Sequence, residues 1–164
     1  MAQLVIIRHA KAVDRLQAED DFERGLTPRG REDAARAADA IASAGLGADR
    51  ALVSPARRTR ETWSLIAPVM GEPVIEDPMA LYHASDTMLQ RLALEAFEGG
   101  AERLVIVGHN PGVGAFAHQL ADLAGASRDL PYGWPTSGAA GFSLQTRSDG
   151  FDAVNRVFLF NPKA

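Results

Sequence analysis

The sequence contains no cysteine among its 164 residues, which excludes a disulfide-stabilised fold, a thiolate zinc site and a cysteine nucleophile. The net charge is also small: 17 basic and 21 acidic residues leave −4. A general nucleic-acid-binding surface is therefore not expected. No apolar run approaches the roughly 20 residues of a membrane span, and the chain starts without the basic segment of a signal peptide. We expect a cytoplasmic protein with neither nucleic-acid nor membrane partners.

The length predicts one domain over residues 1–164, because domains typically hold about 100–200 residues. The composition, 46% hydrophobic and 23% charged, is ordinary for a globular protein. A chain of this size buries roughly 70% of its surface on folding. We therefore expect an ordered core.

Short apolar runs alternate with helical patterns along the chain. Strands are predicted at residues 4–7, 52–53, 74–75 and 104–108, and two more at 139–146 and 154–160. Helices are predicted to start at the cap-plus-proline pairs Thr27-Pro28, Ser54-Pro55 and Asn110-Pro111, and another is predicted over residues 88–97. Pro68 should end or kink the second helix, and the charged residues 11–26 are typical of a loop. This order predicts an α/β fold, a three-layer α/β/α sandwich with a mostly parallel sheet of about six strands. The last two strands follow each other without a helix, so one edge should be antiparallel.

Polar residues stand where three of these strands end. Arg8-His9 follows the first strand, Ser54 and the arginines 57 and 58 follow the second, and Gly108-His109-Asn110 ends the late apolar strand. Ligands of open α/β sheets bind at the carboxyl ends of the strands, where helix N-termini also converge. Two histidines and a group of arginines should therefore share one rim.

These residue types favour phosphate chemistry. The arginine fork matches phosphate oxygens and stays charged. The chain has no cysteine, no P-loop and no H-E-x-x-H metal motif, so histidine is the best available nucleophile and no metal or cofactor is expected. A neutral imidazole can accept a phosphoryl group, and water can then remove it.

Three motifs in this order resemble the histidine phosphatase superfamily: Arg8-His9-Ala10, the spacing of Ser54, Arg58 and Thr62, and Gly108-His109-Asn110. Within it, the short chain and the segment Arg24-Gly25-Leu26-Thr27 resemble SixA-type phosphohistidine phosphatases. The resemblance implies a phosphoglycerate mutase-like fold, here with no sizeable cap domain.

The resemblance also implies roles for individual residues. His9 would be the phosphorylated nucleophile, with Arg8, Arg58 and His109 holding the phosphate. Arg24 and Asn110 are further candidates for the phosphate pocket, although Asn110 is first of all a helix cap. Arg57 is expected to be a surface or supporting residue, and His83 and His118 to be structural or surface residues.

The sequence lacks a carboxylate where larger relatives place a glutamate acid, within Pro78–His83. Glu76, Asp77, Asp20 and Asp21 are nearby acids, but none is a convincing match. This lack favours a substrate with a P–N bond, whose leaving nitrogen can already be protonated. The leading hypothesis is a metal-independent phosphatase for phosphohistidine on a signalling protein, such as a histidine phosphotransfer domain.

Two alternatives remain open. One is a broad-range phosphomonoesterase that acts on small phosphates or phosphopeptides. The other is a catalytically inactive module that binds phosphorylated ligands. A dinucleotide-binding protein is disfavoured, because no G-x-G-x-x-G follows the first strand.

Overall fold

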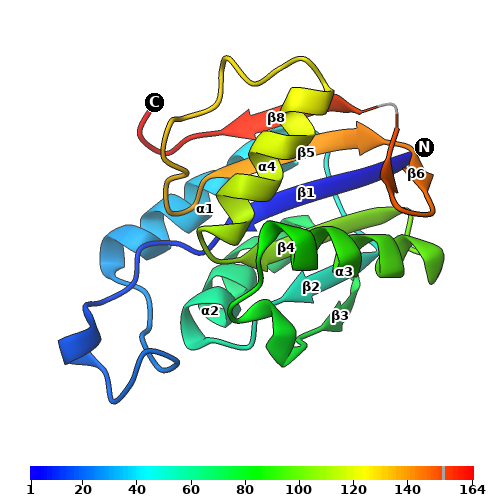
Figure 1. Cartoon of the computed structure of the whole chain (residues 1–164). Coiled ribbons are helices and arrows are strands. Elements are labelled where there is room, and N and C mark those ends of the chain that lie inside the picture. Colours follow the sequence, from blue (N-terminus) through cyan, green and yellow to red (C-terminus); the bar gives the residue numbers. More distant parts are fainter. Residues whose placement is uncertain (153) are drawn as a thin grey trace.

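A computed structural model describes residues 1–152 and 154–164 and contains a central six-stranded sheet (Figure 1). The strand order is β3-β2-β4-β1-β5-β8. The strands are β1 (Ala2–Arg8), β2 (Arg50–Val53), β3 (Val74–Glu76), β4 (Arg103–Gly108), β5 (Ala139–Leu144) and β8 (Asn155–Phe160). The pairs β1–β4, β4–β2 and β2–β3 are parallel, whereas β5 runs antiparallel to both β1 and β8. The prediction of a mostly parallel sheet with an antiparallel edge is confirmed.

Helices cover both faces of the sheet, which confirms the three layers (Figure 1). They are α1 (Pro28–Ser43), α2 (Arg57–Ile66), α3 (Asp86–Glu98) and α4 (Gly112–Leu123). Alternate residues of the central strands serve the two layers, because successive side chains of a strand point to opposite faces. Leu4 and Ile6 pack on the α3–α4 side, and Val5 and Ile7 pack on the α1–α2 side. All four side chains are fully buried.

The helix starts follow the predicted signals in two of three cases. Thr27 caps α1, since its side chain accepts a hydrogen bond from the Gly30 N–H. The α4 helix begins just after Pro111, and Asn110 Oδ1 accepts from the Gly114 N–H. The prediction that Ser54-Pro55 starts α2 was wrong: this helix begins at Arg57, and its N-cap Ala56 has no side-chain hydrogen bond.

Other predicted boundaries hold with small shifts. The α2 helix ends at Ile66, and a 3₁₀ turn over Ala67–Val69 contains Pro68. Residues 139–146 form β5 followed by the start of a small hairpin, β6 (Thr146–Arg147) and β7 (Gly150–Phe151), which was not predicted. Among the described residues, no helix combines the length and apolar character needed to cross a membrane.

The segment of residues 11–26 extends beyond the carboxyl ends of the parallel strands (Figure 1). It contains a single 3₁₀ turn, Arg15–Gln17, and a bridge between Ala12 and Leu26 closes its base. The same end of the sheet carries the first turns of α2 and α4. The polar residues predicted at the strand ends therefore lie at the same end of the sheet as this segment.

Candidate active site

The two central strands bring His9 and His109 together. In the parallel pair β1–β4, Arg8 lies opposite Gly108, and the His9 N–H donates to the Gly108 carbonyl oxygen over 3.0 Å. The next residue of each strand end is therefore a histidine at the same level. Their ring centroids are 5.4 Å apart and the ring planes are inclined by 56°.

His9 presents one ring nitrogen as a free base. Its Nδ1 lies 2.7 Å from the Ala10 carbonyl oxygen. Because a carbonyl oxygen only accepts, Nδ1 carries the proton and Nε2 keeps its lone pair. Burial is the main cause that lowers the pKa of His9 to about 3; the Ala10 hydrogen bond opposes it, and interactions with His109, Arg58 and Arg8 lower the pKa further. The ring is neutral at pH 7, as a nucleophile requires.

His109 is held from the side of α2. Its Nε2 lies 2.7 Å from the Ser54 hydroxyl oxygen, and Ser54 is fully buried. Burial and the positive charge of Arg58 are the largest causes that lower the pKa of His109 to about 4. His109 is therefore also neutral at pH 7, with one nitrogen engaged by a hydroxyl group.

The spacing of Ser54, Arg58 and Thr62 has a structural reason. Ser54 contacts His109, while the Thr62 hydroxyl accepts from the Ala10 N–H over 2.9 Å and donates to the Arg58 carbonyl oxygen over 2.7 Å. The end of β2 and the first turns of α2 are thus connected to the residues that follow both β1 and β4. Arg58 lies in the chain between Ser54, which contacts His109, and Thr62, which contacts Ala10.

Arg8 and Arg58 place two guanidinium groups beside the histidines. Arg8 Nη1 donates to the Trp134 carbonyl oxygen over 2.7 Å, and burial, with a further contribution from Arg58, lowers the pKa of Arg8. Arg58 is buried, and its Nη1 and Nη2 both donate to Asp21, to the carbonyl oxygen and to the carboxylate respectively.

Buried polar atoms without a partner gather at this site. Among residues 1–152 and 154–164, five buried side-chain polar atoms have no protein hydrogen-bond partner, and three belong to predicted site residues: Arg8 Nε, Arg58 Nε and His109 Nδ1. A fourth, Ser137 Oγ, is on a residue whose N–H donates to the Arg8 and His9 carbonyl oxygens. Ser137 also has a left-handed backbone (φ 64°), a strained conformation that is typical of functional sites. Leaving buried donors unpaired is costly, so their concentration indicates a ligand with several acceptors.

The two further candidates lie beside this group. Arg24 Nε donates to the Val13 carbonyl oxygen and its Nη1 donates to Asp21 Oδ1 over 2.9 Å, so Arg24 reaches the site through Asp21. The Asn110 amide donates to the Trp134 carbonyl oxygen and accepts from the Gly114 N–H. Both side chains are thus engaged by the chain itself.

Sequence reasoning did not assign the contacts of Asp21 and Tyr82. The Tyr82 hydroxyl donates to Asp21 Oδ2, and its ring lies 5.7 Å from that of His109. The Tyr82 hydroxyl and the arginines 24 and 58 hold the pKa of Asp21 well below its usual range, although partial burial opposes them. Asp21 is therefore ionised at neutral pH and is a poor proton donor. Its position among the eight acidic or basic residues of the 11–26 segment gave no signal that would single it out.

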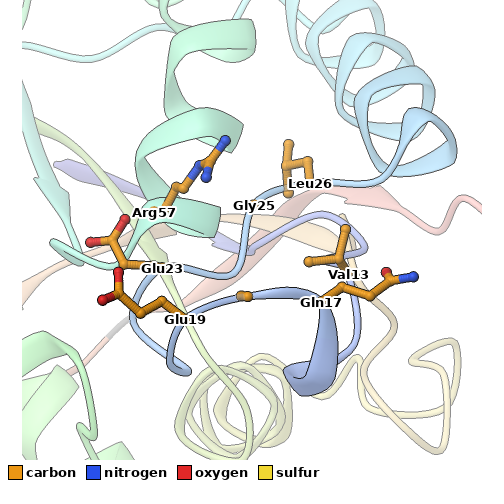
Figure 2. Close-up of a pocket in the computed structure, with 8 residues that line it drawn as sticks. Val13, Gln17, Glu19, Glu23, Gly25, Leu26 and Arg57 are labelled. Atoms are coloured by element: carbon orange, nitrogen blue, oxygen red, sulfur yellow. The ribbon is translucent and has the colours of Figure 1, made fainter.

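A separate pocket of about 390 Å³ lies between the 11–26 segment and the first turn of α2, and Figure 2 shows its lining residues. They are Val13, Gln17, Ala18, Glu19, Glu23, Gly25, Leu26 and Arg57. Arg57, the cation of this set, pairs with Glu61 over 3.0 Å. Because two carboxylates would repel an anion, this pocket is a poor phosphate site, and the histidine pair is the better candidate.

No group of three or more histidine, aspartate or glutamate side chains suited to a metal ion occurs in the described part of the chain.

The sheet order and the strand-end histidines define the class of phosphoglycerate mutase-like α/β proteins. The model of the histidine phosphatase superfamily (branch 1) matches residues 4–79. A protein provisionally named phosphohistidine phosphatase SixA, from Agrobacterium tumefaciens, is 27% identical with a TM-score of 0.80, over 98% of this chain and 99% of that one. A similarly named protein from Nakamurella multipartita has the same fold at 22% identity (TM-score 0.80, 99% and 97% covered). An uncharacterized Picosynechococcus protein is 29% identical over 73% of each chain.

The chain is similar to the histidine phosphatase superfamily over residues 4–79 and to a SixA-type protein over nearly its whole length. This similarity supports phosphatase activity.

Proposed function

We propose that this protein is a metal-independent phosphatase that works through a phosphohistidine intermediate on His9 and hydrolyses phosphohistidine on a signalling protein. The observation that carries this proposal is the group of unpaired buried donors, Arg8 Nε, Arg58 Nε and His109 Nδ1, beside a histidine whose Nε2 keeps its lone pair. A phosphoryl group has three oxygens that accept from such donors. A smaller anion would leave some of them unpaired.

In the first step, the His9 Nε2 lone pair forms a bond to phosphorus while the bond from phosphorus to the leaving nitrogen breaks. The leaving imidazole takes the bonding electrons and departs neutral, because its other nitrogen already carries a proton. His9 becomes a phosphorylated, positively charged ring. Its Nδ1–H, directed at the Ala10 carbonyl oxygen, stabilises that charge.

In the second step, water forms a bond to phosphorus and the bond to His9 Nε2 breaks. The electron pair returns to Nε2, and both protons of the water stay on the phosphate that leaves. Arg8 and Arg58 stabilise the phosphoryl oxygens in both transition states. Their charge is present beforehand, so little reorganisation is required.

In this mechanism, Ser54 determines which ring nitrogen of His109 carries the proton. When the Ser54 hydroxyl donates to His109 Nε2, a neutral ring carries its proton on Nδ1, the nitrogen without a protein partner. That N–H then donates to the phosphoryl group. His109 thus binds the transferred group together with the two arginines.

The lack of a proton donor for the leaving group favours a substrate with a P–N bond. Asp21, the carboxylate bonded to Arg58, is held in its ionised form and offers no proton to an alkoxide. A protonated nitrogen leaving group needs none. The names of the Agrobacterium and Nakamurella relatives agree with this substrate class. Residues 1–164 are proposed to act without a cap domain, which leaves room for a phosphorylated protein, such as a histidine phosphotransfer domain.

The test is a side-by-side assay on a phosphohistidine protein and on ordinary phosphomonoesters, each with and without a chelator. We expect turnover that persists with chelator, a higher kcat/KM on the phosphohistidine protein, and no turnover by His9→Ala. Enzyme quenched in an alkaline denaturant, in which the P–N bond is stable, should carry a phosphoryl group on His9. Equal or higher rates on monoesters would favour the broad-range enzyme, and bound vanadate without any turnover would favour the binding module.

A further inference from the structure

Asp21 is bonded to more of the site than any other residue of the 11–26 segment described above. Its carbonyl oxygen accepts from Arg58 Nη1 over 2.8 Å, and its Oδ2 accepts from Arg58 Nη2 over 3.1 Å. Its Oδ1 accepts from Arg24 over 2.9 Å. Both outer nitrogens of the buried arginine are therefore held by one residue of a loop.

Tyr82 completes this arrangement from another element. Its hydroxyl donates to Asp21 Oδ2, and the Arg58 guanidinium carbon lies 5.9 Å from the centre of its ring. Phe22 packs edge-on against the same ring, with centroids 5.1 Å apart. Arg58 is thus fixed by two hydrogen bonds along its outer edge and by an aromatic ring.

Nε is the one nitrogen of Arg58 that is buried and has no acceptor among the described residues. Arg58 also contributes to the lowered pKa values of His9, His109 and Arg8, so its charge lies close to all three. A long side chain loses much conformational freedom when it is ordered. If the Arg58 side chain is already ordered before substrate binds, the entropy lost in ordering it does not reduce the stabilisation of the transition state.

We propose that Asp21 is a positioning residue, which holds Nη1 and Nη2 of Arg58 so that the Nε–H stays directed at the phosphoryl group. This inference rests on the proposed function, in which Arg58 binds that group. Asp21 also places a negative charge near a dianion, which opposes substrate binding. The two effects have opposite signs, and kinetics can separate them.

The matched pair is Asp21→Asn and Asp20→Asn, which remove the same charge from neighbouring positions. The Asp20 carboxylate contacts the Glu23 N–H and no arginine among the described residues. We expect Asp21→Asn to lower kcat by about 10- to 100-fold, with KM changed less than kcat, and Asp20→Asn to leave both unchanged. A rise in kcat/KM for Asp21→Asn would overturn the proposal, because Asp21 would then only compete with substrate for Arg58.

A double-mutant cycle with Arg58→Ala shows whether Asp21 acts through Arg58. In the Arg58→Ala background, Asp21→Asn should no longer lower kcat/KM, because only its opposing effect on substrate binding remains. An equal loss in both backgrounds would overturn the proposal. If Asp21→Asn does not fold, Tyr82→Phe removes only one donor to the carboxylate and should give a smaller loss that also disappears in Arg58→Ala.

The same cycle is measured by calorimetry with vanadate, which mimics the phosphoryl transition state and requires no turnover. We expect weaker vanadate binding by Asp21→Asn only when Arg58 is present. A wild-type protein that binds vanadate but hydrolyses nothing would refute the proposed function, while the cycle still decides the role of Asp21. A protein that binds no vanadate would refute both.

Discussion

Arg57 and Arg58 are neighbours in the chain with opposite environments. Arg58 is buried and both of its outer nitrogens bond to Asp21. The Arg57 side chain is half exposed and pairs with Glu61. Because α2 turns by about 100° per residue, only one of the two can point to the histidines.

We predict that Arg58→Ala lowers kcat/KM by about 10²- to 10³-fold, the usual loss when one charged donor to a transition state is removed. Arg57→Ala is the matched control and should change kcat/KM less than threefold, since exposed ion pairs contribute little. Steady-state kinetics of both variants on one aryl phosphate would measure this. The reverse ranking would contradict the assignment of Arg58.

The sequence indicated Arg58 because it stands four residues from both Ser54 and Thr62, a spacing that resembles a known family motif. Asp21 has no such pattern, since its importance comes from contacts with residues 37 and 61 positions away. The Ser54 hydroxyl was read as a helix cap, because a serine before proline has that meaning in most chains. Its real partner, His109, is 55 positions away. Local patterns do not contain such distant pairings.

At the scale of elements, Gly30 sets how closely α1 approaches the end of β1. A Cβ atom at this position would lie 2.2 Å from the Lys11 carbonyl oxygen. That oxygen also accepts from the Thr27 N–H over 2.9 Å. The first turn of α1 therefore packs directly on the backbone two residues after His9.

Gly30→Ala should destabilise the protein by about 3 kcal/mol, because the helix must move away from a backbone that cannot yield. Helix propensity alone predicts the opposite sign, a gain of about 1 kcal/mol. Urea unfolding measures the difference. Gly133→Ala is the control, since a Cβ there meets no atom within 4 Å, and it should be nearly neutral. A stabilised Gly30→Ala variant would show that the approach is not tight.

The elements themselves were largely predictable, because their apolar periods are strong. Leu104–Val107 is a continuous apolar run that is fully buried in β4, and the helix start at Thr27-Pro28 was correct. The β6–β7 hairpin was missed, since strands of two residues leave no periodic signal. The hairpin connects β5 to β8, so its location depends on where these two strands end, which is settled only when the sheet is assembled.

For the whole molecule, the site carries a cost in stability that depends on pH. The folded protein holds His9 neutral, with a pKa of about 3, whereas an unfolded histidine has a pKa of about 6.5. Between these values the unfolded chain binds more protons, so the free energy of unfolding falls as the pH falls. His109, with a pKa of about 4, acts in the same direction.

We therefore predict that acidification from pH 7.5 to 5 costs the wild type about 2 kcal/mol more than it costs His9→Asn, given 1.36 kcal/mol per pKa unit. Asparagine retains an N–H for the Ala10 carbonyl oxygen but does not titrate. Urea unfolding of both proteins at the two pH values gives the difference. Equal acid sensitivity would mean that the His9 pKa is not lowered by folding.

The register of β1 against β4 has a consequence for how this chain can change in length. An inserted residue ahead of either histidine would displace that ring by about 3.3 Å and turn it to the other side of the sheet, whereas Arg8 now lies opposite Gly108. Insertions and deletions are thus barred from these strands. They are tolerable only in connections such as the tip of residues 14–19, where added residues leave the partnering of the strands intact.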